Sequence, residues 1–316
     1  LVTENKEALY VYRQTTPNST FTGIIGCADT DEYFDGTIKK HENTLQKREE
    51  KFKQYLDITN FNAEPVLLTY KKSEDIDHIL GRYSNTRPEF DFSTTDRVRH
   101  QLWIVDNIEH ISKITQAFEK IDALYIADGH HRCASSALLA KERVENNGNP
   151  NGSFKGILSY FLSDDQLEIL PFHRLVTCNS EQEKSTILAE IKKQFADEEG
   201  KIKVCDGKEY FRISLKPTQQ DAMGRLCSEL LTQQILTPIC KIEDLRNDKR
   251  IDFIGGRMGK EEFQKNVNKL TNGIGFYLNS VEASDLFEIA DKGQVMPPKS
   301  TYIEPKLRSG LTILEF

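Results

Sequence analysis

The segment LYIADGHHR at residues 124–132 ends in an acid, a glycine, two histidines and an arginine in five consecutive positions. Its apolar first half is typical of a short buried strand, and the Ala- and Leu-rich residues 133–142 predict a helix directly after it. The start of such a helix attracts anions, because its first N–H groups are unpaired and the helix dipole is positive there. The residues of this turn that could bind a phosphate are Gly129, His130, His131 and Arg132.

The side chains of this turn suit a phosphate better than zinc. Arg132 carries a planar fork of donors that fits phosphate oxygens, and Gly129 lets a ligand approach the backbone closely. His130 and His131 are adjacent in the sequence, so their side chains diverge, and no HExxH pattern accompanies them. The sequence therefore does not indicate a zinc site.

A second chemically varied segment is KKHENT at residues 39–44. Glu42 could act as a general base, because a carboxylate can accept the proton of a substrate hydroxyl as that oxygen attacks. His41 beside it could contact a phosphate or the substrate. The same residues also fit a solvated helix with ordinary charge pairs between neighbouring turns. Both interpretations stay open at this point.

A third segment, MPPKST at residues 296–301, lies near the C-terminus and is followed by further charges that include Lys306 and Arg308. Its two prolines fix an extended backbone immediately before a cation and two hydroxyls. Lys299, Ser300 and Thr301 could therefore be held rigidly over a phosphate. The alternative is a rigid C-terminal tail that packs on its domain.

Two weaker features lie in the second half of the chain. His173 and Arg174 follow a Pro-Phe pair and could join an anion site, although such a pair is more often a surface or core pair. Residues 255–259, GGRMG, are rich in glycine but have neither the P-loop nor the Rossmann spacing. A hairpin turn is the better interpretation of this segment.

The elements that position these residues alternate between strands and helices, which predicts an α/β or α+β fold. A break rich in turn formers at residues 145–152 marks a domain boundary or a long surface loop. We expect one domain at 1–145 and an α/β domain at 146–316, whose tail, 291–316, returns to the active site. Expected strands cover 8–14, 21–27, 66–70, 124–127, 156–162, 167–170 and 210–215, and expected helices cover 29–57, 75–83, 108–118, 133–142, 181–195, 221–236 and 260–270.

The composition of the 316 residues narrows the functional classes. A net charge of −7 argues against broad binding of nucleic acid, which relies on a basic face. No run approaches the roughly 18 apolar residues of a spanning helix, so no membrane association is expected. Six scattered cysteines without a CxxC pair favour a reduced, cytoplasmic chain. The first residue is not Met, so residues upstream of it are expected.

The order of these motifs resembles the free L-serine kinases of the ParB and sulfiredoxin-like superfamily, and more closely an uncharacterised family related to them. The resemblance runs through YVYRQ, IKKHENT, YIADGHHR, LPFHRLV, IDFIGG and VMPPKSTYIEPKLRSGL and covers nearly the whole chain. It implies a ParB-like nucleotide-binding catalytic domain at 1–145. It further implies Glu42 as the base with His41 beside it, and Asp128 as a Mg²⁺ ligand or second acid–base group. The phosphate ligands that it implies are His130, His131 and Arg132, with Lys299, Ser300 and Thr301 closing the site.

The activity implied by the resemblance is phosphoryl transfer from ADP or ATP, with Mg²⁺, to the hydroxyl of free L-serine, giving O-phospho-L-serine. Another small hydroxylated acceptor, or a ParB-like nucleotide-binding switch, is the alternative. The switch is disfavoured because no helix-turn-helix pattern or basic patch is found. Sulfiredoxin chemistry is disfavoured because the turn carries His130 where that family has a cysteine. The oligomeric state stays open, a homodimer included.

Overall fold

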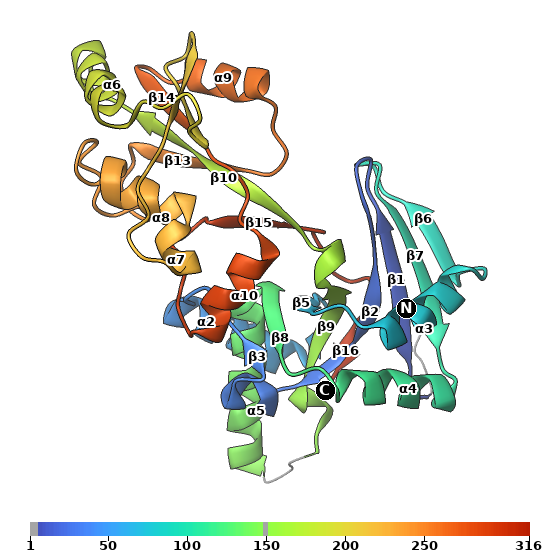
Figure 1. The fold of residues 1–316 in the computed structure, drawn as a ribbon. Coiled ribbons are helices and arrows are strands. Elements are labelled where there is room, and N and C mark those ends of the chain that lie inside the picture. The colour runs from blue at the N-terminus through green and yellow to red at the C-terminus, as the bar shows by residue number, and fades with distance from the viewer. Residues whose placement is uncertain (1–5, 148–150) are drawn as a thin grey trace. The chain divides into compact units, whose positions relative to one another are not determined.

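The computed structural model describes residues 6–147 and 151–316, and mixed α/β architecture runs through all of it (Figure 1). The chain separates into two compact units, one made of Leu1–Glu168 with Pro305–Phe316 and the other of Ile169–Glu304. The second unit is therefore inserted into the sequence of the first. The predicted fold class is confirmed.

The first unit is built on a mixed eight-stranded sheet in the order β3-β8-β5-β9-β2-β1-β7-β6. Only the pairs β3 with β8 and β5 with β9 are parallel. Near the N-terminus, β1 and β2 form a hairpin and pair antiparallel with Tyr10 opposite Ile25. The strands are β1 (Leu9–Thr15), β2 (Thr20–Asp29), β3 (Ile38–Lys39), β5 (Val66–Tyr70), β6 (Phe90–Ser93), β7 (Arg99–Val105), β8 (Leu124–Asp128) and β9 (Gly156–Ser163), with a separate pair of β4 (Phe61–Asn62) and β16 (Leu314–Glu315).

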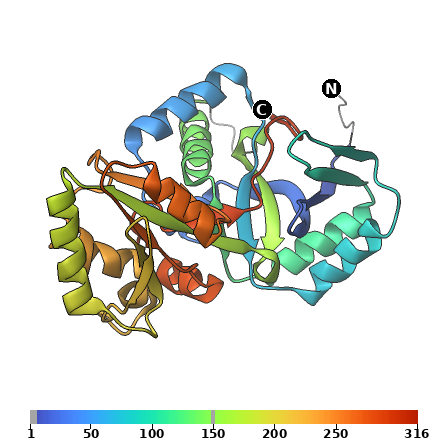
Figure 2. The same cartoon turned by 90° about the horizontal axis from the view of Figure 1, so that it is seen from above.

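The helices of the first unit pack through apolar faces, which the helical spacing of their apolar residues creates. In α3, Ile76, Ile79 and Leu80 are buried at helical spacing, and they join one core cluster with strand residues such as Leu68 and Ile126. Figures 1 and 2 show α2 and α5 side by side within this unit. The helices are α1 (Asp31–Asp35), α2 (Gln46–Thr59), α3 (Glu74–Ser84), α4 (Ile108–Phe118) and α5 (His130–Asn147).

The second unit has a six-stranded sheet in the order β12-β11-β14-β10-β13, with β15 also pairing β10. Two separate clusters of apolar side chains form its core, one around Phe276 and one around Phe263. The strands are β10 (Glu168–Thr177), β11 (Ile202–Cys205), β12 (Tyr210–Ile213), β13 (Ile251–Gly255), β14 (Gly273–Tyr277) and β15 (Thr301–Glu304), and the helices are α6 (Glu181–Phe195), α7 (Ala222–Arg225), α8 (Cys227–Leu231), a π-helix at Thr232–Leu236, α9 (Lys260–Asn268) and α10 (Ala283–Asp291).

Several elements differ from the sequence-based expectations. The expected helix at 29–57 is two helices separated by β3, so residues 40–45 are not helical. The expected hairpin turn at 255–259 instead connects β13 to α9. The structure divides the chain at 168/169 and 304/305 rather than at 145/146, because β9 pairs with β2 and β5. Within the expected break at 145–152, residues 148–150 lie outside the described residues.

No helix of the described residues combines the length and the apolar character that crossing a bilayer requires.

Truncation of Ile126 should destabilise the first unit. Ile126 is fully buried in β8, so Ile126→Ala should lower the free energy of unfolding by about 2–5 kcal/mol through lost burial and a residual cavity. Ile58→Ala, at a position 81% exposed in α2, is the matched control and should change it by less than about 0.5 kcal/mol. Urea titration followed by fluorescence of Trp103, the single tryptophan, reports on this unit. Equal effects of the two substitutions would contradict the packing described above.

Candidate functional site

The segment DGHHR forms the predicted strand-to-helix turn, with Asp128 ending β8 and His130 beginning α5. Gly129 has a φ of +95°, a conformation that L side chains rarely adopt. A Cβ at Gly129 would lie 3.0 Å from Nη2 of Arg132, so the guanidinium packs closely against the glycine. The backbone N–H of Cys133 donates to the carbonyl of Gly129 at 2.9 Å, which makes it the first backbone hydrogen bond of the helix. The backbone N–H groups that precede Cys133 have no partner within the helix, and such groups can bind an anion.

Arg132 joins this turn to the loop that precedes β5. Its Nη2 lies 3.0 Å from Oδ2 of Asp128, and its Nη1 lies 3.0 Å from Oε1 of Glu64. Nη1 also donates to the carbonyl of Pro65. The side chain is 15% exposed. The guanidinium is therefore held in one position before any ligand arrives, with part of its donor capacity already used.

Asp128 receives a second cation from the C-terminal part of the first unit. Nζ of Lys306 lies 3.3 Å from Oδ1 of Asp128, while Oδ2 faces Arg132. From the sequence, Lys306 is only one of several charges that follow MPPKST. The signal that could have found it is its place in a motif with two prolines and a third, Pro305, immediately before it. Glu64 carried no such signal.

His41 and Glu42 lie beside the turn because β3 and β8 run parallel, with Ile38 paired to Leu124 and Lys39 to Tyr125. The rings of His41 and His130 are 4.6 Å apart between centroids and nearly perpendicular, at 83°. Oε2 of Glu42 lies 3.9 Å from Nδ1 of His130. Two segments about 90 positions apart in the sequence thus contribute to one cluster. His41 and His130 are buried, whereas the Glu42 side chain is 52% exposed.

Burial keeps the histidines of the cluster neutral. It lowers the pKa of His41 to about 4. It also places the pKa of His130 well below the ordinary value, with further lowering from repulsion by His41 and His131 when these are protonated, and by Lys40. The pKa of His131 is lowered by burial and then by Arg48. At neutral pH these rings can therefore donate or accept a hydrogen bond, but they do not supply positive charge.

Some ring nitrogens of this cluster are without partners. Nδ1 of His41, Nε2 of His130 and Nδ1 of His131 are buried and make no hydrogen bond to the described residues. A buried polar atom without a partner costs roughly 1–3 kcal/mol. A ligand that hydrogen-bonds to these atoms would recover part of that free energy.

A cavity of about 580 Å³ lies next to the turn, between α2 and α5. Arg132 forms part of its wall, and Ser136 adds a buried hydroxyl with no partner among the described residues. The aromatic rings of Phe52 and Tyr55, which are 41% and 48% exposed, line the same cavity. Its basic lining residues are Arg48 and Lys51, together with Arg132. The cavity offers an aromatic surface and cations in one place.

Lys299, Ser300 and Thr301 belong to the second unit, and their part in the site of the first unit stays a prediction. Oγ of Ser300 donates to the carbonyl of Pro297 and lies 2.8 Å from Oγ of Ser228, so this hydroxyl is already engaged. Lys299 has a φ of +58°, and its Nζ lies 5.1 Å from the ring centroid of Phe172. Thr301 begins β15.

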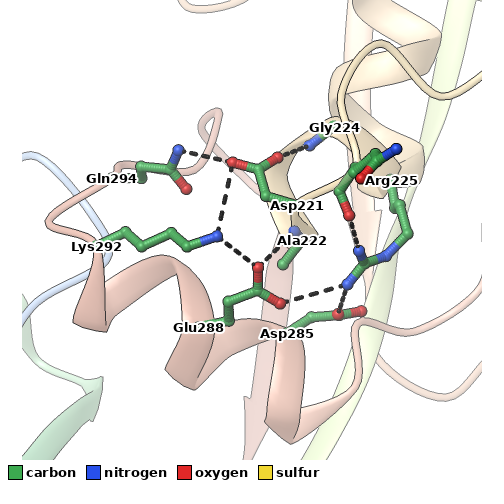
Figure 3. Close-up of polar contacts among 9 residues, drawn as sticks. Asp221, Ala222, Gly224, Arg225, Asp285, Glu288, Lys292 and Gln294 are labelled. Atoms are coloured by element: carbon green, nitrogen blue, oxygen red, sulfur yellow. Dashed lines mark hydrogen bonds and ion pairs between the residues drawn. The ribbon is translucent and has the colours of Figure 1, made fainter.

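A polar network anchors the chain just before MPPKST (Figure 3). The amide of Gln294 donates to Asp221 at 3.0 Å, and Asp221 also accepts from the N–H of Gly224 in α7. Lys292 lies 2.7 Å from Glu288 of α10, which in turn faces Arg225 at 3.4 Å. These contacts join α10 to α7 directly before the MPPKST segment.

The candidate residues do not form a metal site on their own. Among the described residues no group of three His, Cys, Asp or Glu side chains is arranged to hold a metal ion. Both carboxylate oxygens of Asp128 face cations. A Mg²⁺ ion usually takes one or two carboxylates and completes its coordination with substrate phosphates and water. Mg²⁺ therefore fits this site only as part of a nucleotide complex.

The sequence model of a family described as Protein of unknown function (DUF1015) matches residues 1–279. No curated protein matches the chain.

Among solved structures, the chain is similar to SbnI with a C-terminal truncation from Staphylococcus aureus, at 13% identity and a TM-score of 0.47, over 89% of this chain and 82% of that one. It is similar to a variant of a free serine kinase in complex with ADP, at 15% identity and a TM-score of 0.42, over 89% and 87%. It is also similar to a conserved hypothetical protein from Pyrococcus furiosus, at 14% identity and a TM-score of 0.40, over 90% and 94%.

The neutral state of His41 should make stability depend on pH. Its pKa is about 4 in the folded chain and about 6.5 when unfolded, so the unfolded chain binds more protons between these values. Stability contributed by the neutral ring is complete above pH 6.5 and is lost as the pH falls toward 4, by up to about 1.4 kcal/mol per pH unit. His41→Gln should flatten this dependence in urea titrations between pH 6 and 4.5 and leave it unchanged above pH 7.5. An unchanged slope below pH 6 would show that His41 is not buried neutral.

Proposed function

The chain belongs to the DUF1015 family, and we propose that it transfers a phosphoryl group from ADP or ATP to the hydroxyl of a small acceptor, with free L-serine as the preferred acceptor. The observation that carries this proposal is the position of Glu42 beside the DGHHR turn, with its carboxylate 3.9 Å from His130. This position supports a joint role in which Glu42 acts as the general base and the helix start binds the phosphoryl group, although the two come from distant segments of the sequence. The resemblance of the motifs supports the proposal that the site is of the ParB and sulfiredoxin-like type.

In the proposed step, the acceptor hydroxyl oxygen attacks the terminal phosphorus of the nucleotide. The new O–P bond forms as the bond from that phosphorus to the bridging oxygen breaks, and Glu42 takes the hydroxyl proton. The products are the phosphorylated acceptor and AMP or ADP. The exposed carboxylate of Glu42 suits this role, because an acceptor must reach it from solvent.

Positive charge and N–H donors of the turn would stabilise the transferring phosphoryl group. The backbone N–H groups at the start of α5 lie at the positive end of the helix dipole and can donate to an anion. His130 and His131, neutral at pH 7, would donate ring N–H groups, while Arg132 and Lys306 supply charge. Fixed donors of this kind stabilise developing charge without having to reorganise during the reaction.

Mg²⁺ would arrive with the nucleotide as part of the substrate. Asp128 is the carboxylate of the turn that could bind it, in exchange for one of its cationic partners. Bound to the phosphates, Mg²⁺ would neutralise charge on the transferring group. We further propose that Lys299 and Thr301 close over the phosphates and that Ser300 holds their segment in shape, because its hydroxyl is engaged with Pro297 and Ser228.

The cavity between α2 and α5 is the proposed place of the nucleoside. The rings of Phe52 and Tyr55 offer a surface on which a base can stack, and Arg132 links the cavity to the turn.

The six cysteines are free thiols, which supports a reducing compartment such as the cytoplasm.

Replacement of Glu42 tests the base. Glu42→Gln keeps the shape of the side chain but cannot accept a proton, so turnover should fall by about 10²- to 10⁴-fold while nucleotide affinity stays within a few-fold. Formation of O-phosphoserine is followed by ³¹P NMR with Mg²⁺, L-serine and either ADP or ATP, and affinity by calorimetry. Glu109→Gln, at an exposed position in α4, is the control. Nucleotide binding by the wild type without any phosphorylated product from L-serine or other small alcohols would indicate a switch instead.

Replacement of Phe52 tests the nucleoside position separately. Phe52→Ala removes one stacking ring and should weaken ADP binding by about 5- to 100-fold. The affinity for pyrophosphate, which has no base, should stay the same. Phe34→Ala removes a similarly exposed ring from α1 and serves as the control. Calorimetric titrations with both ligands give the comparison. Equal weakening of ADP and pyrophosphate would place the base elsewhere.

A further inference from the structure

The second unit contains a pocket of about 680 Å³ that the proposed reaction does not use. It is lined by β10, by the turn from β13 to α9, and by the residues that follow β14. Its polar lining residues include His173, Arg257, Asn279, Ser280 and Glu282. All of them belong to the second unit, so residues of this unit alone form the pocket.

His173 in the wall of this pocket is a fixed hydrogen-bond donor without an acceptor. Its Nδ1 accepts the backbone N–H of Leu278 at 3.1 Å, so the neutral ring carries its proton on Nε2. The side chain is fully buried, and burial lowers the pKa of His173 to about 4, so the ring is neutral at pH 7. Stacking on Tyr277, with centroids 4.0 Å apart, fixes its orientation. The Nε2 donor has no partner among the described residues.

Ring nitrogens without a partner among the described residues are also found at the buried His41 and His130 of the candidate functional site, whereas His100 in the first unit has both ring nitrogens paired. His100 is equally buried, but its Nδ1 lies 2.7 Å from the hydroxyl of Tyr12 and its Nε2 lies 3.3 Å from Oγ1 of Thr94. Both ring nitrogens of a core histidine are thus paired there. An unpaired N–H costs free energy that an acceptor on a ligand would recover.

The turn from β13 to α9 adds backbone donors to the same pocket. Gly256 has a φ of +98°, and Gly259 is the N-cap of a nine-residue helix with no side-chain hydrogen bond to the cap. The first backbone hydrogen bond of α9 joins the N–H of Phe263 to the carbonyl of Gly259, which leaves the preceding N–H groups for other acceptors. A helix start of this kind favours an anion. The exposed Arg257 lines the pocket beside it.

We propose that this pocket binds a small metabolite through a carboxylate or phosphate group, which accepts from Nε2 of His173 and from the start of α9 and pairs with Arg257. Glu282 lines the same pocket, so an ammonium group on the ligand would also find a partner there. The pocket shares no lining residue with the proposed phosphoryl-transfer site, and the proposal does not depend on that activity.

The test follows the histidine side chains of the full ¹⁵N-labelled chain by long-range ¹H–¹⁵N NMR at constant ionic strength. Sodium phosphate, sodium acetate and glycine are titrated separately, with sodium chloride as the blank, and the Nε2 signal of His173 is assigned by its loss in His173→Gln. A saturable shift of this signal with phosphate or with acetate identifies the group that binds. Tighter binding of glycine than of acetate identifies an ammonium partner at Glu282.

Arg257→Ala should weaken the binding by about tenfold, as the loss of a charge-assisted contact does. Arg246→Ala, at another exposed position of the second unit, should leave the affinity unchanged. Both variants keep His173 in place, so the NMR signal is observed in each. The proposal is overturned if none of the three probes gives a saturable shift, if sodium chloride reproduces it, or if both arginine variants weaken binding equally.

Discussion

The guanidinium of Arg132 connects two segments that the sequence keeps far apart, because it contacts Asp128 at the end of β8 and both Glu64 and the carbonyl of Pro65 before β5. Asp128 in turn contacts Lys306. A largely buried guanidinium between two carboxylates is favourable only while all partners are present, and loss of one partner leaves charge uncompensated. The shape of the turn, and with it the position of the helix start, depends on this set of contacts.

The neutral histidine pair adds a second constraint to the same place. His41 and His130 are packed ring against ring, so protonation of either would place a charge in a buried position beside the other. Hydrogen-bond donation and positive charge therefore come from different residues of the cluster, whereas a single protonated histidine can supply both. Neutral rings provide directional N–H groups, whereas positive charge comes from Arg132 and Lys306.

Local sequence patterns were sufficient for the strand, turn and helix around DGHHR and for the mixed α/β class. They were not sufficient for β3, which has two residues and therefore no periodicity of its own; its pairing with β8 is what brings Glu42 to the turn. The single helix expected at 29–57 was wrong for the same reason. The helical spacing of apolar residues continues through Ile38–Lys39, but these residues form β3 and pair with β8. Lys306 could not be placed by local reasoning, because its partner Asp128 lies 178 positions away.

The insertion of the second unit has a consequence for the order in which the protein is made. Residues Pro305–Phe316 belong to the first unit, yet the ribosome synthesises them only after the whole of Ile169–Glu304. Until then the first unit lacks β16, the strand that pairs with β4, and Asp128 lacks Lys306. The DGHHR turn is therefore completed late in synthesis, and a nascent chain that stops within the second unit carries this motif without its second cation.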